Sequence, residues 1–390
     1  MRVLFLTDSL SDLDGVGRYA LRLISAMEAQ RPGLEVHVLL AHKHRPTSAQ
    51  VPAHWRVEVA LPPDYFFYMS PPRYWAWRAI GTLRAWRAAR RADVVHAIKD
   101  FPHNQLALDA ARWAGKPCIA TAHGTYTIQP LLDARHGARA RRTYRGFARM
   151  VSVSHYTRRR LLELMGPEQL VPERVEVIPN CVDAAHYAAP REVGRKPWHA
   201  GPFSLSIGEV KERKGHHLAL AGWCLAAAAH PDWQHFVVGR LSGDPYEALL
   251  RGLVADAGCA ERVHFLGNVS EDEKIDLLQR AEVFVHTPVT ASDGGFEGFG
   301  IVYLEASAAG TAALGTLDCG AEDAIVDGET GFLVAQRTEA VAQRLGELMA
   351  DADLRARLGA AGRAHAARST WAPNAARVLA IYDEALGGGA

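Results

Sequence analysis

Short runs of apolar residues alternate with longer segments of helical periodicity along the first half of the chain. The run RVLFLT (2–7) is almost wholly apolar, as expected of a parallel strand buried on both faces. The segment GRYALRLISAMEAQ (17–30) after it has apolar residues at helical spacing. Further apolar runs follow at 35–41, 93–98, 116–123, 149–154 and 174–180, with helical stretches between several of them. This rhythm predicts a doubly wound α/β domain.

The same pattern restarts after a polar break containing Gly and Pro at 191–202. Five more short strands are predicted: FSLSIGE, QHFVVG, RVHFLG, VFVHTP and TAALGT. We therefore expect two Rossmann-like domains, residues 1–195 and 196–368. Residues 369–390 predict a helix that packs back toward the N-terminal domain, with a flexible glycine end. Ligands of such sheets bind at the carboxyl ends of the strands, so two facing domains would form a cleft.

Composition is that of a soluble globular protein, with 48% hydrophobic and 22% charged residues in 390. Because no run of about 18 apolar residues is present and the N-terminus does not resemble a signal peptide, we expect a cytoplasmic protein. The five cysteines are scattered, which favours neither a disulfide framework nor a zinc site. We expect no structural metal.

Charge is distributed unequally between the two halves. Residues 1–200 have 29 Lys and Arg against 17 Asp and Glu, a net charge of +12. Residues 201–390 have 15 against 26, a net charge of −11, and the two values sum to the +1 of the whole chain. This asymmetry supports a boundary near residue 200 and suggests that the first half faces something anionic.

Tryptophan and arginine gather in residues 70–93, where Trp75, Trp77 and Trp86 alternate with Arg73, Arg78, Arg84, Arg87, Arg90 and Arg91. Such a helix can lie on an anionic membrane surface, which suits a lipid-linked acceptor and a peripheral position on the inner face of the membrane. The alternative is that the tryptophans pack into the core while the arginines are solvated. Nucleic acid is not expected, because no recognised binding module accompanies the charge.

Two loops of the first half are candidates for ligand contacts. The loop with Gly15 and Gly17 opens a helix, whose free N–H groups favour a phosphate oxygen, although a helix entry without a ligand fits equally well. A dinucleotide fingerprint is not supported there, because the loop after the strand is too long for its tight turn. His123 ends a predicted strand, where it is either a structural residue or a side chain in the cleft.

Two loops of the second half have charged residues after strands. Lys211, Arg213 and Lys214 crowd together in an otherwise acidic domain, which favours an anion site such as a diphosphate over a solvated turn. Glu271 and Lys274 lie where a nucleotide base would rest. Ser270 and Glu273 around them also fit a capping box, which needs no ligand.

The stretch GGFEGFGIVYLEASAAG (294–310) places Glu297 in a glycine-rich loop and Glu305 in a predicted helix. Eight residues of helix do not bring two side chains to one face, so we interpret the glutamates as two separate contacts. Glu297 can accept hydrogen bonds from sugar hydroxyls, and Glu305 can hold a ribose diol. Backbone N–H groups of Gly298, Phe299, Gly300 and Ile301 would meet the phosphates between them.

Six motifs in this order resemble the family-four retaining glycosyltransferases of the GT-B fold: GVGRYA, AHGTY, VSVSHYTRRRL, VEVIPNCVDAAHY, RKGHHLAL, and EGFGIVYLEASAAG with GETGFLV downstream. The resemblance covers almost the whole chain. It implies two Rossmann-like domains facing each other across a cleft. It also implies transfer of a sugar from a nucleotide diphosphate donor with retention of the anomeric configuration, without a metal or other cofactor.

The resemblance also assigns roles. It implies that Glu297 contacts the donor sugar, Glu305 the ribose and Lys214 the diphosphate. His123 would touch the sugar near its C6 hydroxyl, and the Gly15/Gly17 loop would close near the diphosphate and the acceptor. The catalytic candidates are therefore Glu297, His123 and Lys214, and the donor-binding candidates are Gly15, Gly17, Lys211, Glu271, Lys274, Gly298, Phe299, Gly300, Ile301 and Glu305.

The sequence departs from the family pattern where an arginine usually follows the glycine after the strand. Glu209 stands at that position, and Lys211, two residues on, is the candidate to replace the charge. For retention, front-face attack is favoured over a covalent intermediate on Glu297.

Three functions remain open from the sequence. The first is transfer of a hexose to a glycan or lipid-linked acceptor in surface polysaccharide or glycolipid synthesis, with GDP-mannose slightly favoured over a UDP-hexose. The second is a nucleotide-sugar epimerase, and the third is a non-catalytic nucleotide-sugar binding protein.

Overall fold

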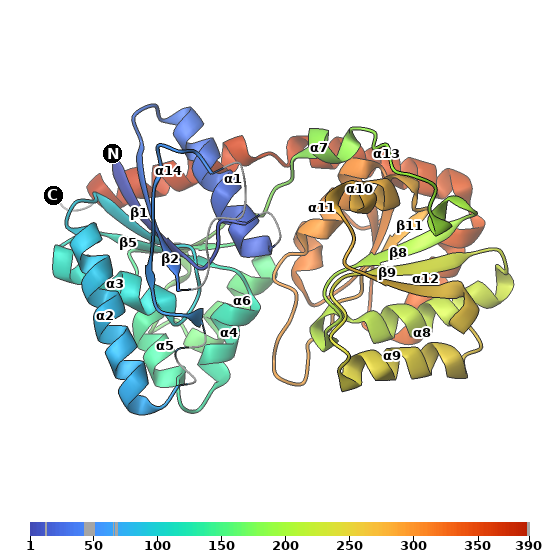
Figure 1. Ribbon diagram of the computed structural model, residues 1–390, viewed down its shortest axis with the longest axis horizontal. Coiled ribbons are helices and arrows are strands. Elements are labelled where there is room, and N and C mark those ends of the chain that lie inside the picture. The colour runs from blue at the N-terminus through green and yellow to red at the C-terminus, as the bar shows by residue number, and fades with distance from the viewer. Residues whose placement is uncertain (12–13, 43–50, 65, 67–68, 388–390) are drawn as a thin grey trace. The chain divides into compact units, whose positions relative to one another are not determined.

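The computed structural model describes residues 1–11, 14–42, 51–64, 66 and 69–387, which form two compact units (Figure 1). Unit 1 comprises Met1–Asn180 and Trp371–Ala390, and unit 2 comprises Cys181–Thr370. Each unit is a parallel sheet with helices on both faces, so the predicted pair of Rossmann-like domains is confirmed. The glycine end predicted to be flexible, residues 388–390, lies outside the described residues.

The sheet of unit 1 has seven strands in the order β3-β2-β1-β4-β5-β6-β7, and its pairings are parallel. The strands are β1 (Arg2–Thr7), β2 (Glu35–Ala41), β3 (Arg56–Leu61), β4 (Val94–Ala97), β5 (Cys118–Ala122), β6 (Arg149–Ser152) and β7 (Val175–Val177). The central strands are buried on both faces, which explains their continuous apolar runs.

Helices of unit 1 connect these strands: α1 (Gly15–Gln30), α2 (Pro71–Ala89), α3 (His103–Ala114), α4 (Thr125–Leu132), α5 (Gly137–Tyr144) and α6 (His155–Met165). The C-terminal helix α14 (Trp371–Gly387) completes the unit and packs against α1 (Figure 1). Tyr382 of α14 is fully buried, and its hydroxyl contacts Nδ1 of His96 at 2.6 Å. The last helix of the chain is therefore part of the core of unit 1.

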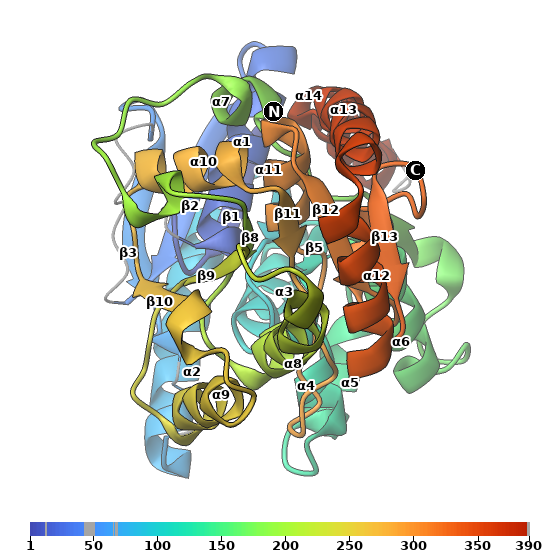
Figure 2. The same ribbon diagram turned by 90° about the vertical axis from the view of Figure 1, so that its right-hand side faces the viewer.

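Unit 2 has six strands in the order β10-β9-β8-β11-β12-β13: β8 (Phe203–Ile207), β9 (Gln234–Val238), β10 (Val263–Gly267), β11 (Val283–Val285), β12 (Ala312–Thr316) and β13 (Gly331–Val334). Helices α8 (His216–Ala226), α9 (Pro245–Asp256) and α12 (Thr338–Ala350) cover one face. Helices α7 (Ala184–Ala188), α10 (Glu271–Arg280), α11 (Ile301–Ala309) and α13 (Ala352–Arg368) lie on the other (Figure 2). Gly222 permits the close contact of α8 with α12, because a Cβ there would lie 2.5 Å from Val341 Cγ1.

Two edge strands were missing from the sequence prediction. β3 is half-exposed, so its residues do not form a continuous apolar run, and β13 has only four residues. The boundary between the two units also differs from the predicted one at residue 195, because residues 181–195 already belong to unit 2. Tyr187 in this region is buried within unit 2.

Each sheet has one point where the strand order reverses, between β1 and β4 in unit 1 and between β8 and β11 in unit 2. Helices leave such a pair of strands toward opposite faces, which opens a crevice at the carboxyl ends where α/β proteins bind ligands. The loops after these four strands therefore define the positions at which functional side chains are expected.

The first and the last residues of unit 2 are hydrogen-bonded to each other. The backbone N–H of Val182 donates to the carbonyl of Ser369 at 3.1 Å, and Cys181 Sγ donates to the carbonyl of Thr370 at 3.1 Å. Both ends of unit 2 are therefore tied to each other where the chain enters and leaves it.

Candidate active site

Glu297 lies at the reversal point of unit 2, surrounded by basic side chains. Lys214 ends the 3-10 turn η4 (Glu212–Lys214) after β8, and its Nζ forms an ion pair with Glu297 Oε2. Arg213 Nη1 lies 3.6 Å from the same oxygen, and His286 Nε2, directly after β11, lies 3.5 Å from it. Loops from the two central strands thus bring together Glu297 and Lys214, two of the predicted catalytic residues.

The Glu297 carboxyl is only 8% exposed yet ionised. Burial opposes its ionisation, but the charges of Lys214 and Arg213 and the hydrogen bond with His286 hold its pKa well below the ordinary value. Burial also lowers the pKa of His286. A carboxylate held in this way is a strong hydrogen-bond acceptor and a poor proton acceptor.

Close backbone approaches fix the loops around Glu297. A Cβ on Gly215, which follows Lys214, would lie 1.7 Å from the carbonyl oxygen of Thr287. Gly300 has φ of 80°, a conformation that favours glycine, and it is the N-cap of α11. Gly298 and Phe299 precede it, and Ile301 begins the helix. All four predicted phosphate contacts therefore lie at the N-terminus of α11.

Glu209 forms a second charged cluster at the ends of β8 and β9. Its carboxylate pairs with Arg240, and Lys211 Nζ lies 2.9 Å from its Oε2. The two glycines before these residues allow the approach, since a Cβ on Gly239 would lie 2.0 Å from the carbonyl oxygen of Gly208. Arg240 was not predicted from the sequence; its position after a strand and a glycine, as for Glu209, was the available signal.

Glu305 of α11 is almost fully buried, at 3% exposure, and contacts the polar side chains of Tyr187 and Lys274. Its Oε1 accepts a 2.8 Å hydrogen bond from the Tyr187 hydroxyl, and its Oε2 lies 3.4 Å from Lys274 Nζ. Lys274 also lies 3.0 Å from Glu271 Oε2. The structure therefore brings the predicted donor-binding residues Glu271, Lys274 and Glu305 together and adds Tyr187, which the sequence prediction missed.

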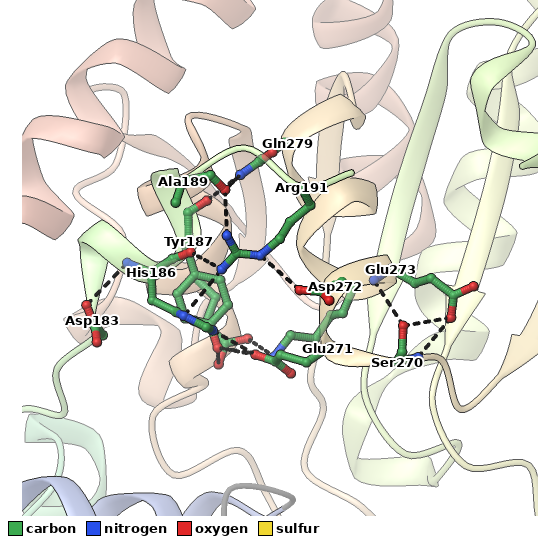
Figure 3. Close-up of polar contacts among 12 residues, drawn as sticks. Asp183, His186, Tyr187, Ala189, Arg191, Ser270, Glu271, Asp272, Glu273 and Gln279 are labelled. Carbon is green, nitrogen blue, oxygen red and sulfur yellow. Dashed lines mark hydrogen bonds and ion pairs between the residues drawn. The ribbon is translucent and has the colours of Figure 1, made fainter. Parts of the chain in front are cut away.

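The capping box predicted at the start of α10 is also formed. Ser270 Oγ accepts from the N–H of Glu273, and Glu273 accepts from the N–H of Ser270 at 3.0 Å (Figure 3). Glu271 and Lys274 do not take part in these two bonds. The cap and a ligand contact by Glu271 and Lys274 are thus compatible.

His123 follows β5 in unit 1, and its ring packs edge-on against Tyr19 with centroids 4.9 Å apart. Burial and the nearby Lys99 lower the pKa of His123 to about 4, so the imidazole is neutral at pH 7. Its Nε2 has no hydrogen-bond partner among the described residues. This nitrogen is therefore the candidate atom of His123 for a ligand contact.

The glycines of the N-terminal loop differ in their surroundings. Gly17 is tightly enclosed, since a Cβ there would lie 2.6 Å from the backbone nitrogen of Ser11, whereas a Cβ on Gly15 would have no atom within 4 Å. The Gly17 N–H donates to the Asp14 side chain at 2.7 Å as part of the N-cap of α1. Gly17 therefore fulfils a helix-entry role in this structure.

A buried charged cluster at the reversal point of unit 1 was not predicted. Lys99 after β4 forms an ion pair with Asp8 after β1. Asp100 is 1% exposed and accepts a hydrogen bond from Thr127 Oγ1 at 2.5 Å. Burial raises the pKa of Asp100 to about 7. The two carboxyl groups thus share one buried lysine.

Helix α2 has several large apolar residues on its exposed side. Its buried positions are Tyr74, Gly81, Thr82, Ala85 and Ala89. Trp75 is 51% exposed, and Leu83, Trp86 and the neighbouring Trp113 of α3 line an open pocket of about 390 Å³. The alternative in which the tryptophans of 70–93 fill the core therefore does not describe Trp75. None of the described helices is long and apolar enough to cross a bilayer.

Family models match both units of the chain. Residues 13–186 match the Glycosyltransferase Family 4 model, and residues 195–365 match the Glycosyl transferases group 1 model. With the parallel sheets described above and the relatives below, they show that the chain belongs to the family-four glycosyltransferases of the GT-B fold. The predicted resemblance is confirmed.

Among curated proteins, phosphatidyl-myo-inositol mannosyltransferase of Mycobacterium tuberculosis is 30% identical over 315 residues, covering 79% of this chain and 78% of the relative. A GDP-mannose-dependent alpha-(1-6)-phosphatidylinositol monomannoside mannosyltransferase of Mycolicibacterium smegmatis is 30% identical over 269 residues, or 67% and 68% of the two chains. Among solved structures, Anabaena HepE in complex with UDP-glucose has a TM-score of 0.74 at 19% identity over 97% of this chain and 99% of its own. That likeness shows the fold.

Proposed function

We propose that this glycosyltransferase moves a hexose from a nucleotide diphosphate sugar to a lipid-linked or glycan acceptor, with retention and without a metal. The charge balance at the reversal point of unit 2 supports this proposal. Two carboxylates, Glu209 and Glu297, pair there with four cations: Lys211, Arg213 and Lys214 from the loop after β8, and Arg240 from the loop after the neighbouring β9. The resulting excess of two positive charges matches a diphosphate diester with two negative charges.

In the proposed mechanism Lys214 and Arg213 stabilise the diphosphate as it leaves the sugar. The bond between C1 and the phosphate oxygen breaks, and the acceptor hydroxyl forms its bond to C1 from the same face. Its proton passes to the departing phosphate oxygen. Glu297 accepts hydrogen bonds from the sugar hydroxyls; its low pKa suits this role better than that of a base. Neutral His123 provides Nε2 for a sugar hydroxyl.

GDP-mannose is the proposed donor, ahead of a UDP-hexose. Both relatives described above carry mannosyltransferase names, and one name specifies GDP-mannose. Their names also specify phosphatidylinositol-based acceptors, which supports a glycolipid as the acceptor class here.

The outer face of α2 supports a peripheral position on a membrane. Trp75, Ile80 and Leu83 are exposed on it, and Arg78 lies 5.1 Å from the centre of the Trp75 ring. Apolar side chains of this size beside arginines favour the interface of an anionic bilayer.

A transfer assay tests the proposed function. The purified chain is incubated with GDP-mannose or UDP-glucose and phosphatidylinositol vesicles, with and without EDTA, and products are followed by mass spectrometry. We expect a glycolipid that carries one added hexose, formed from GDP-mannose in either condition, with an axial anomeric bond by NMR. Conversion of the donor without an acceptor would instead indicate an epimerase, and binding without turnover would indicate a non-catalytic protein.

Co-sedimentation tests the membrane surface separately. We expect the protein to sediment with anionic vesicles at low salt, and the Trp75→Ser and Leu83→Ser double variant to remain in solution. Substitution of Leu249→Ser, an exposed leucine of α9 in unit 2, is the matched control. Equal sedimentation of all three proteins would contradict the assignment of α2.

A further inference from the structure

The hydroxyl of Tyr187 stands between two charged residues of the candidate nucleotide site. It donates to Glu305 Oε1 at 2.8 Å and accepts from Lys274 Nζ at 3.1 Å. Glu271 Oε1 lies 3.3 Å from the same hydroxyl. The ring of Tyr187 adds a second contact, because Lys274 Nζ lies 5.0 Å from its centroid.

The segment that carries Tyr187 is fastened to α10. Gln279 Nε2 donates to the carbonyl oxygens of Tyr187 and Ala189, both at 2.8 Å (Figure 3). Arg191 Nε lies 3.1 Å from Asp272 Oδ1, and Lys196 forms an ion pair with Glu273 farther along α10. A side chain on a segment held at several points can fix the orientation of its neighbours.

We propose that Tyr187 is a positioning residue of the nucleotide site, which orients Glu305 and Lys274 for the ribose of the donor. This inference rests on the proposed function. A carboxylate that receives a ribose diol must present its oxygens in one orientation, and at 3% exposure Glu305 takes that orientation from its hydrogen bonds. Tyr187 supplies the 2.8 Å bond from an element outside α11.

The position of Tyr187 gives the site a second property. Tyr187 follows Cys181, the first residue of unit 2, by a few positions, and the chain between them has the N-cap Asp183 of α7. One hydroxyl therefore connects Glu305 with the segment at the start of unit 2.

The variant Tyr187→Phe tests the role, because it keeps the ring over Lys274 and removes only the hydroxyl. Isothermal titration calorimetry compares GDP with 2′,3′-dideoxy-GDP, and UDP with its dideoxy analogue, for wild type and variant. We expect the affinity for the ribonucleotide to fall about tenfold, the equivalent of one hydrogen bond to a charged group. The affinity for the dideoxy analogue is expected to stay unchanged, so the preference for ribose shrinks.

The variant Tyr246→Phe is the matched control, since it removes a hydroxyl that contacts His217 Nδ1 at 2.8 Å in the same unit. It should leave the ribose preference intact. An unchanged ratio of the two affinities in Tyr187→Phe, whether both fall together or neither falls, would overturn the positioning role. If wild type binds none of the four nucleotides, the proposed function fails as well. If Tyr187→Phe does not fold, Tyr187→Leu replaces it in the same titrations, and a retained ribose preference in that variant would overturn the positioning role.

Discussion

The reversal points of the two sheets have the same topology but different chemistry. In unit 1 the loops after β1 and β4 bring Asp8, Lys99 and Asp100 into a buried cluster with two carboxyl groups and one cation. In unit 2 the loops after β8 and β9 bring cations together in excess beside the loop after β11, and the side chains of Lys211 and Arg240 are 44% and 63% exposed.

This difference in charge suits the two reversal points to different ligands, although the strand order is the same. A buried cluster with more carboxyl groups than cations does not attract an anion. It can accept hydrogen bonds from neutral hydroxyl groups, or it can stabilise the fold of the unit. An exposed excess of cations suits a diphosphate. The fold supplies the crevice in both units, and the residues that follow the strands decide what can enter it.

Glu297→Gln is expected to have the largest effect. Loss of the carboxylate removes the acceptor for the sugar hydroxyls, so turnover should fall about 100-fold or more. The cluster gains a positive charge, so GDP affinity should stay equal or increase. Steady-state kinetics and calorimetry measure both, with Glu339→Gln on the exposed face of α12 as the control. Near-normal turnover would remove Glu297 from the mechanism.

Asp100→Asn removes the titrating carboxyl of the unit 1 cluster, and between pH 4 and pH 8 the difference in the free energy of unfolding from wild type should change by about 4 kcal/mol. The pKa of Asp100 is raised from 3.8 to about 7, so the folded state binds the proton more tightly than the unfolded state. Its contribution to stability is present at low pH and is lost as pH rises from about 4 to about 7. The variant should therefore melt higher than wild type at pH 8 but not at pH 4.

Comparing wild type with Asp100→Asn isolates the contribution of Asp100 to the pH dependence of stability from that of other buried groups. His96 and His123 have pKa values lowered to about 3 and about 4, so they make stability rise with pH between those values and about 6.5. These slopes are common to wild type and variant and cancel in the difference. A constant difference in melting temperature across this pH range would contradict the raised pKa of Asp100.

Arg240 and Glu209 offer the smallest and most selective test. Arg240→Met should weaken GDP binding about threefold, because the side chain is largely exposed and screened. Glu209→Gln should strengthen it by a similar factor, and exchange of the two residues, Glu209→Arg with Arg240→Glu, should restore the wild-type value. Arg368→Met on α13 serves as the control. A diphosphate site that does not use this cluster would show equal affinities in all four variants.

Much of the fold was predictable because central strands of a parallel sheet are buried on both faces and therefore appear as apolar runs. The edge strands β3 and β13 lack that signal, and both were missed. The loops that carry Lys214 and Glu297 were found because glycine and charge cluster in them. Arg240 was missed because its position after a strand and a glycine is a weak signal alone, and its pairing with Glu209 depends on β9 lying beside β8.

Tyr187 and the cluster of Asp8 and Lys99 were missed for a related reason. Asp8 and Lys99 are 91 residues apart, and only the pairing of β1 with β4 brings them together. Tyr187 contacts Glu305 across 118 residues. Motif spacing describes single loops, whereas these contacts depend on the order of strands and on the path of the connecting segment.

The place of α14 has a consequence for synthesis of the protein. Unit 2 is contiguous in the chain and ends at Thr370, so all of its strands and helices are synthesised before α14. Unit 1 begins first but lacks the helix that buries Tyr382 against His96 until α14 has been synthesised. The domain that is started first is therefore finished last, and during that interval the apolar surface beneath α14 is open to chaperones.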